Sequence, residues 1–95
     1  MKSELLIRTR RILAENAFVE VVIWKIPQPV AGSTHSFKYR LAFVIDGICQ
    51  LRYDNEAGKG DHKHLGIVET PYRFISPKQL LSDFWQDVDN WEAQT

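Results

Sequence analysis

A two-residue turn signal, Asp46-Gly47, does most to limit the folds open to this chain. It stands between two runs rich in β-branched and aromatic residues, 37–45 and 48–54. Asp-Gly accepts the positive φ angles of a type I′ turn, which joins two antiparallel strands directly. With two residues in the loop, the opposed pairs 45/48, 43/50, 41/52 and 39/54 share one face, which is half polar, and the pairs 44/49, 42/51 and 40/53 share the other face. This register predicts a buried face that consists of Ala42, Val44, Cys49, Leu51 and Tyr53.

A second hairpin is expected before this one. Residues 18–26, FVEVVIWKI, are β-branched and aromatic and end at Pro27, which indicates a strand. Residues 3–13 alternate apolar and polar side chains, although Ser3 is also an acceptable helix cap. The short connector at 15–17 favours the hairpin over the helix.

The last part of the chain has helical spacing. Ser76 and Pro77 suit an N-cap and a first helical turn, and residues 70–74 before them are expected as an edge strand or extended chain. The fold class predicted is α+β: a hairpin-rich antiparallel β-sheet meander of about four to six strands, covered on one face by a C-terminal α-helix from about Pro77 to Trp91. The apolar stripe of this helix contains Leu80, Leu81, Phe84, Trp85, Val88 and Trp91.

Length and composition predict one cytoplasmic domain, 1–95. The longest apolar runs are too short to cross a bilayer, and the first residues lack the apolar core of a signal peptide. The single cysteine, Cys49, excludes an intrachain disulfide and is expected to be a small buried hydrophobe.

The net charge of zero hides a separation of charge. All twelve Lys and Arg residues lie in 1–78, whereas every charged side chain in 79–95 is acidic. A basic body suits a polyanionic ligand, although a solvated helix face explains the same pattern. The acids of the last segment are Asp83, Asp87, Asp89 and Glu92.

The segment 52–64, RYDNEAGKGDHKH, is expected as an exposed loop that follows the second strand of the hairpin, and it concentrates groups that bind phosphate or transfer protons. Two glycines flank Lys59 and leave the backbone free to present N–H groups to an anion. His62 and His64 provide two imidazoles, one to accept the 2′-hydroxyl proton of RNA and one to protonate the leaving oxygen. Lys59 and Arg52 would stabilise the charged phosphate. These four are the candidate catalytic residues.

A metal site is the alternative for the same segment. An extended His-x-His places both rings on one side, so Asp61, His62 and His64 are candidate ligands. Two histidines and one acid form a sparse ligand set. The expected chemistry is therefore metal-independent and without a cofactor, while a metal site and an inert hairpin loop stay open.

Basic and aromatic residues near this segment are typical of a surface that holds phosphates and stacks unpaired bases. The alternative for each tyrosine is packing in the core, and Arg52 with Asp54 would then form a surface ion pair. The candidate RNA-binding residues are Lys63, Arg40, Tyr39, Tyr53 and Arg73.

Together these segments resemble a known family. WKIPQPVAGSTHSFKYRLAFVIDG, then LRYDNEAGKGDHKH, then PYRF and DFWQDV are similar to the TumE-like toxins of bacterial and archaeal type II toxin–antitoxin modules. The likeness spans nearly the whole chain, and YDNE…KGDHxH is its most specific part. It implies a cytoplasmic toxin, an antitoxin partner that is usually a helix-turn-helix DNA-binding protein, and RNA as the target. No catalytic residue is taken from the resemblance.

Three hypotheses follow. The first is a metal-independent endoribonuclease that uses His62 and His64. The second is a non-catalytic RNA- or protein-binding toxin that acts by occupancy, and the third is a metal-dependent nuclease. A homodimer is compatible with each of them.

Overall fold

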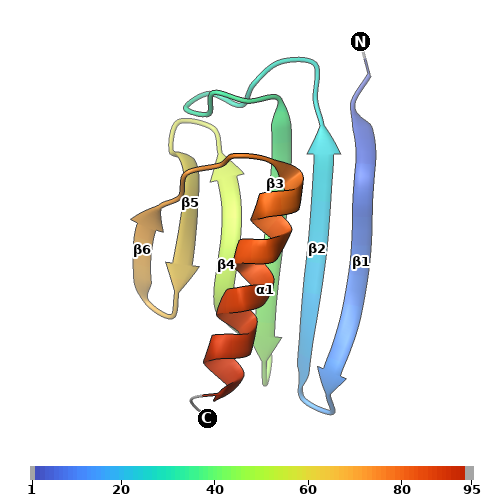
Figure 1. Cartoon of the computed structure of the whole chain (residues 1–95), viewed down its shortest axis with the longest axis vertical. Helices are drawn as coiled ribbons and strands as arrows, with labels where there is room; N and C mark the ends of the chain where they lie inside the picture. Colours follow the sequence, from blue (N-terminus) through green and yellow to red (C-terminus); the bar gives the residue numbers. More distant parts are fainter. Residues whose placement is uncertain (1, 94–95) are drawn as a thin grey trace.

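The computed structural model describes residues 2–93 and shows six strands followed by one helix (Figure 1). Each strand runs antiparallel to its neighbour in sequence, so the sheet is a meander in the order β1 to β6. The predicted α+β class and the covering C-terminal helix are confirmed. The elements are β1 (Glu4–Ala14), β2 (Ala17–Lys25), β3 (Phe37–Ile45), β4 (Ile48–Glu56), β5 (Gly60–Leu65), β6 (Val68–Pro71) and α1 (Pro77–Ala93).

The hairpin of β3 and β4 has the predicted turn but a different register. Asp46 and Gly47 have φ angles of 53° and 75°, as a type I′ turn requires. The pairs 45/48 and 44/49 fit a two-residue loop, but Gln50 then forms a β-bulge. One extra residue reverses the face of every later side chain in that strand. The predicted register is therefore wrong beyond the bulge.

The corrected register decides which side chains of β4 are buried. Leu51 and Tyr53 lie opposite Phe43 and Leu41 and join the core, rather than sharing a face with Ala42 as predicted. Arg52 and Asp54 therefore lie together on the other face of the sheet, beside Ala42 and Arg40.

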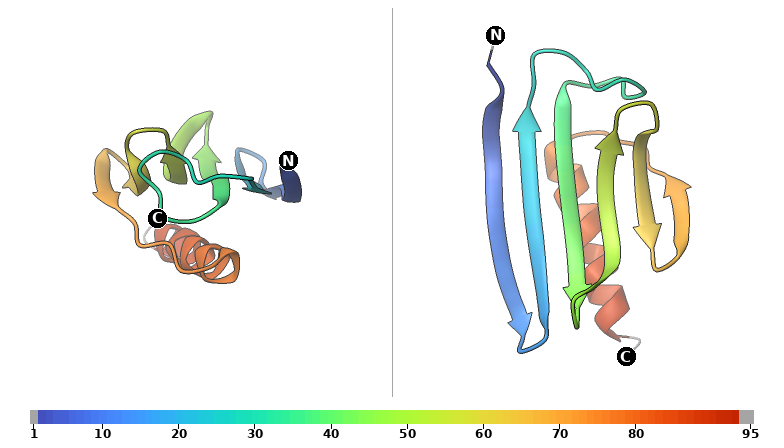
Figure 2. Two further views of the ribbon diagram at one scale, coloured as in Figure 1. Left: turned by 90° about the horizontal axis from the view of Figure 1, so that it is seen from above. Right: turned by 180° about the vertical axis from the view of Figure 1, so that it is seen from behind.

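The hydrophobic core lies between the sheet and α1, which covers one face only (Figure 2). The Oγ atom of Ser76 accepts a hydrogen bond from the Gln79 backbone at 3.0 Å, which confirms the predicted N-cap. Alternate residues of the central strands meet the apolar stripe of the helix. The fully buried members are Val19, Val21, Ile23, Tyr39, Leu41, Phe43, Leu51, Tyr53, Leu80, Phe84 and Val88.

The segment 52–64 is not a loop. It forms the end of β4, a short turn and most of β5, with Glu56 opposite Gly60. Its side chains therefore alternate between the helix side and the opposite side of the sheet, which we call the open face (Figure 2, right).

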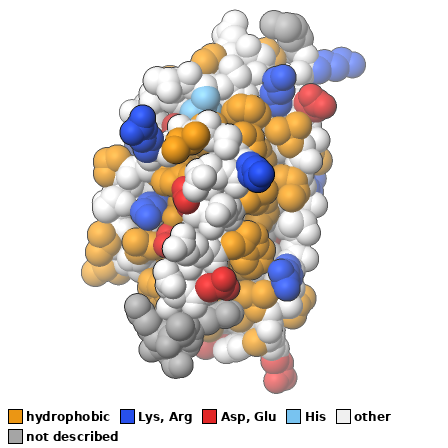
Figure 3. All heavy atoms as spheres, in the orientation of Figure 1, with side chains coloured by type: hydrophobic (Ala, Val, Ile, Leu, Met, Phe, Trp, Pro, Cys, Tyr) orange, Lys and Arg blue, Asp and Glu red, His pale blue; other side chains and the backbone are white. Residues whose placement is uncertain are grey.

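The surface departs from prediction at Cys49, which is exposed rather than buried. On the helix side, apolar side chains remain visible beside α1 (Figure 3), where Ile7, Leu13 and Trp85 are partly buried. The side chain of Glu92 lies outside the described part of the chain. Within residues 2–93, none of the helical structure is long and apolar enough to cross a membrane.

Candidate functional site on the open face

Two cross-strand pairs form the centre of the site. Arg52 lies opposite His64, and Asp54 lies opposite His62, in the antiparallel register of β4 and β5. Opposed residues share one face of a sheet, with Cβ atoms about 5 Å apart. The four side chains therefore meet on the open face, where no part of α1 covers them.

His62 is the most enclosed member of the group. Its residue is 4% exposed, and Asp54 beside it is 6% exposed. The ring Nδ1 lies 3.1 Å from the carbonyl oxygen of Gly60, so Nδ1 carries the hydrogen and donates it. The ring Nε2 lies 2.8 Å from Asp54 Oδ1, which is an ion-pair distance.

The contact between these two atoms lacks hydrogen-bond geometry. Nε2 of His62 and Oδ1 of Asp54 are both buried, and neither has a hydrogen-bond partner among the described residues. The short distance does not contradict the missing hydrogen bond. An ion pair is defined by distance alone, whereas a hydrogen bond also requires a suitable angle at the donor. A buried polar pair left in this state is uncommon in folded proteins.

Arg52 links the acid to the second imidazole. Its Nε lies 3.2 Å from Asp54 Oδ2, so the predicted ion pair is present. Its Nη2 lies 2.9 Å from Nε2 of His64. Because a guanidinium can only donate, Nε2 of His64 is the acceptor in this bond and carries no hydrogen. The side chain of His64 is 21% exposed, so this ring reaches the surface, unlike His62.

Glu69 of β6 and Lys59 form the rim. The Oε1 atom of Glu69 lies 3.7 Å from Nε2 of His62 and 3.9 Å from Nε2 of His64. The Nζ atom of Lys59 lies 3.7 Å from the same oxygen. Lys59 therefore stands beside the candidate histidines, as predicted from the sequence, whereas sequence reasoning gave Glu69 no role.

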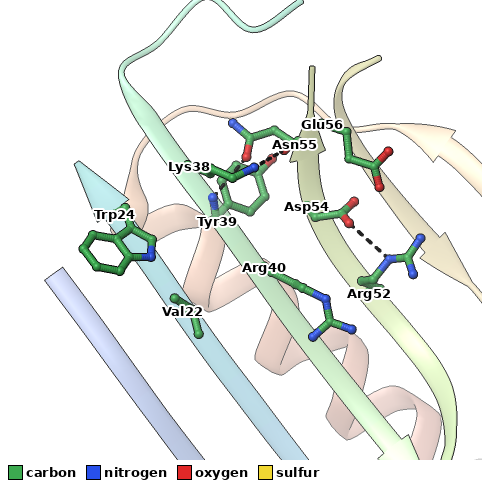
Figure 4. A pocket seen from close by; sticks show the side chains of 9 residues that line it. All are labelled: Val22, Trp24, Lys38, Tyr39, Arg40, Arg52, Asp54, Asn55 and Glu56. Atoms are coloured by element: carbon green, nitrogen blue, oxygen red, sulfur yellow. Dashed lines mark hydrogen bonds and ion pairs between the residues drawn. The ribbon is translucent and has the colours of Figure 1, made fainter. Parts of the chain in front are cut away.

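A hollow of about 400 Å³ continues from this group across β3 to β2 (Figure 4). Trp24 is partly buried at its far side, with the guanidinium of Arg8 6.0 Å from the indole centre. Lys38 and Arg40 are exposed between the indole and Arg52. The sequence reasoning missed Trp24 and Lys38; the alternation of β2 and β3 side chains was the signal that could have found them. The lining residues are Val22, Trp24, Lys38, Tyr39, Arg40, Arg52, Asp54, Asn55 and Glu56.

Two tyrosines expected to bind RNA lie in the core instead. Tyr39 is 2% and Tyr53 is 1% exposed, so neither ring is available to stack on a base. The Tyr39 hydroxyl donates to Asp61 Oδ2 at 2.6 Å, and the Tyr53 hydroxyl donates to Asp87. Burial, strengthened by these carboxylates, raises the pKa of both tyrosines. The alternative of core packing holds for both.

Lys63 and Arg73 also lie away from the group. Lys63 points to the helix side, where its Nζ lies 3.6 Å from Asp87 and 5.5 Å from the ring centre of Tyr53. Arg73 is exposed between β6 and α1 and lines a separate hollow with His35 and Phe74. Of the candidate RNA-binding residues, Tyr39 and Arg40 line the hollow beside the histidines, and of these two Arg40 is the exposed one.

Asp61, the acid of the predicted metal set, faces away from His62. It accepts hydrogen bonds from Ser33 at 2.5 Å and from Tyr39, and its Oδ2 lies 2.6 Å from His35 Nε2. These contacts fasten the connection between β2 and β3 to the start of β5. Asp61 therefore has a structural role, and the acid beside the histidines is Asp54.

Asn55 performs a similar structural task. Its Oδ1 accepts from the Tyr39 backbone at 3.0 Å, and its Nδ2 donates to the Phe37 carbonyl at 2.7 Å. The side chain thus takes the place of a ladder bond between β3 and β4, beyond the last regular pair. This amide holds the strand end that carries Asp54.

A comparison with protein families gives a match that covers all the residues of this site. A family model described as Toxin TumE matches residues 2–92. The chain belongs to this family. Comparison with curated proteins and with solved structures returned no match. Membership of the TumE family implies a cognate antitoxin, and the matched range includes Arg52, Asp54, His62 and His64.

Proposed function

We propose that this TumE family toxin acts on RNA and cleaves it at the open face of the sheet. The observation that carries the proposal is the continuity between two features. A group of histidines and carboxylates adjoins a hollow with cationic and aromatic walls, and both lie on the face that α1 leaves uncovered. Small toxins with a polyanionic target need such a surface.

The hollow suits a single-stranded segment of RNA. The indole of Trp24 offers an aromatic surface for an unpaired base, and Lys38 and Arg40 stand at positions from which they can contact phosphates. The strand would run from Trp24 toward His64, which places a phosphodiester next to Arg52. Tyr39 and Tyr53 take no part in stacking.

The two histidines divide the work differently from the sequence-based scheme. His64 reaches the surface and is the imidazole that can exchange a proton with bound RNA. Arg52 and Lys59 stabilise the developing negative charge on the phosphate. His62 holds Asp54 and the strand end in place, and its enclosed ring is not positioned to meet a substrate directly.

Cleavage is tested by incubating purified protein with total RNA. We expect discrete fragments from the wild type and none from His64→Ala. Lys63→Ala is the matched control, because its side chain lies on the helix side of the same strand, and it should cleave normally. Absence of fragments together with normal growth arrest would favour the second candidate function, inhibition by occupancy.

Binding is tested separately by fluorescence anisotropy with a single-stranded RNA. Loss of stacking on Trp24 is worth about 1–3 kcal/mol, so Trp24→Ala should raise Kd by about 5- to 150-fold. Phe18→Ala is the control, since Phe18 lies on the same face of β2 at its other end and is covered by Arg10 at 4.0 Å. Equal losses in both variants would contradict the proposed path.

The partner belongs to the same proposal. We expect the antitoxin to be a helix-turn-helix DNA-binding protein encoded beside the toxin, and both to act in the cytoplasm. Co-expression of the neighbouring gene should relieve growth arrest and yield a stable complex on purification. A chain that is harmless alone and binds no neighbouring product would remove this part of the proposal.

A further inference from the structure

We propose that Asp54, His62 and His64 bind a divalent transition metal ion of the Zn²⁺ or Mn²⁺ type. Each residue offers one donor atom, and the three donor atoms lie within 4.8 Å of one another. The set differs from the one predicted from sequence, because Asp54 takes the place of Asp61. A site with two imidazoles and one carboxylate has ligand types that such ions accept.

The hydrogen bonding of His62 gives the first argument. Its Nδ1 donates to the Gly60 carbonyl at 3.1 Å, which is the outer contact that metal-bound histidines commonly make. In a ring that carries one hydrogen, that bond leaves the lone pair on Nε2. The lone pair faces Asp54 Oδ1, another acceptor, at 2.8 Å.

Two acceptors this close require a positive charge directly between them, and the guanidinium of Arg52 does not supply it there, since its Nε contacts the other carboxylate oxygen, Oδ2. A proton on Nε2 is one way to supply it, but the contact lacks the geometry of a hydrogen bond. Both atoms are buried, so solvent does not satisfy them. A metal ion coordinated by both atoms satisfies both lone pairs at once, and it does not require an N–H group that points at the carboxylate oxygen.

The arrangement of Arg52 leaves the required oxygen free. Its Nε contacts Asp54 Oδ2, whereas Oδ1 points to His62. His64 would exchange its bond from Arg52 for the ion, and the guanidinium keeps its contact with Oδ2. Glu69, with an oxygen 3.7 and 3.9 Å from the two imidazoles, is within reach as a further ligand.

The site stands next to the hollow proposed for RNA. A metal held there would occupy Nε2 of His64 and take the place of proton transfer by that nitrogen. It would polarise a phosphate oxygen and supply charge stabilisation in addition to that of Arg52. Binding of the ion follows from the geometry of the three ligands alone, so it is measurable whether or not the chain cleaves RNA.

The test is calorimetric titration of the purified chain with Zn²⁺, in a Cys49→Ser background because Cys49 is exposed and a cysteine thiolate is itself a zinc ligand. We expect one ion per chain. Loss of an outer hydrogen-bonding partner already weakens metal sites about 10- to 100-fold, so loss of a direct ligand in Asp54→Asn or His64→Gln should weaken binding more than about 100-fold. Glu56→Gln, which lines the hollow outside the ligand set, should bind as the parent does.

Melting temperatures of all variants in EDTA show whether each is folded before metal is added. Unchanged affinity in folded Asp54→Asn and His64→Gln would overturn the proposal, as would the absence of binding by the parent chain. Zinc binding that depends on these residues, in a protein that leaves RNA intact, would uphold the metal site and remove the nuclease function. Titration with Mg²⁺ should show much weaker binding, because imidazole nitrogens are poor ligands for it.

Discussion

Gly32 and Gly60 lie in direct backbone contact, so that a Cβ placed on Gly60 would stand 2.5 Å from the carbonyl oxygen of Gly32. This contact joins the β2–β3 connection to the turn that precedes His62. The backbone of Gly58 donates to Ala31 at 2.8 Å and supports the same junction. The two segments therefore hold Lys59 and the start of β5 as one unit.

The first prediction compares alanine at two neighbouring glycines. Both have positive φ, 87° at Gly58 and 75° at Gly60, so each substitution carries strain of about 1–2 kcal/mol. Gly60→Ala additionally collides with backbone, whereas a Cβ on Gly58 meets nothing within 4 Å. We expect Gly60→Ala to lower the free energy of unfolding by clearly more than Gly58→Ala does, measured by urea denaturation. Equal losses of unfolding free energy in the two variants would show that the backbone around Gly32 and Gly60 moves apart without destabilising the fold.

The second prediction concerns the packing of α1. Phe84 is 0% exposed and meets the edge of Tyr53, with ring centres 5.7 Å apart. Phe84→Ala should reduce the free energy of unfolding by about 3–5 kcal/mol. Ile75→Ala, at a position 68% exposed, should change it by about 0.5 kcal/mol or less. Similar effects at both positions would contradict the placement of the helix.

Much of this fold follows from local sequence patterns. The Asp-Gly turn, the alternating strands and the Ser-Pro helix start each depend on residues close together in the chain. The bulge at Gln50 has no such signal, and one residue of slip is enough to move Arg52 and Asp54 to the other face. The predicted register of β4 was therefore wrong beyond the bulge even though the hairpin was right.

The site itself was predicted in part. The histidines, Lys59 and Arg52 were singled out by residue type and do lie together. Reading 52–64 as a loop concealed the pairing of Asp54 with His62 and the alternation that sends Asp61 and Lys63 to the helix side. Trp24 comes from a strand that is distant in sequence, so its approach depends on the whole meander. Glu69 is close in sequence and lies opposite His64 across the short hairpin of β5 and β6.

The third prediction concerns high pH. The chain has three tyrosines, and burial, followed by hydrogen bonding to a carboxylate, raises the pKa of all of them. An unfolded tyrosine ionises near about pH 10. Because the pKa is higher in the folded state, the stability that the neutral tyrosines contribute is complete below that pH and declines as the pH rises further.

Alkaline titration measures this directly. Tyrosinate absorbance near 295 nm should rise together with the loss of the far-ultraviolet circular dichroism of the sheet, above about pH 10. Tyr72→Phe removes the least buried of the three tyrosines. In this variant, tyrosinate formation and loss of the circular dichroism signal should still occur together. Tyrosinate that forms with an ordinary midpoint in a chain that stays folded would show that the hydroxyls are accessible.

The fourth prediction separates the two histidines. His62 is enclosed beside Asp54, so His62→Ala leaves a buried carboxylate without its neighbour and should cost about 1–3 kcal/mol of stability. An exposed loop histidine would cost far less, and that was the expectation from sequence. His64→Ala removes one hydrogen bond at a partly exposed position and should cost at most about 1 kcal/mol.

The effects of the two substitutions on activity should not follow their effects on stability. His64→Ala should lower RNA cleavage about 10²- to 10⁴-fold in a protein that melts close to the wild type, because the accessible imidazole performs the proton transfer. His62→Ala should lose growth arrest together with stability, so its activity is to be measured well below its own melting temperature. The assay is RNA cleavage and growth arrest beside urea denaturation for each variant. Full activity in a folded His64→Ala protein would rule out proton transfer by this ring and leave the open face as a binding surface.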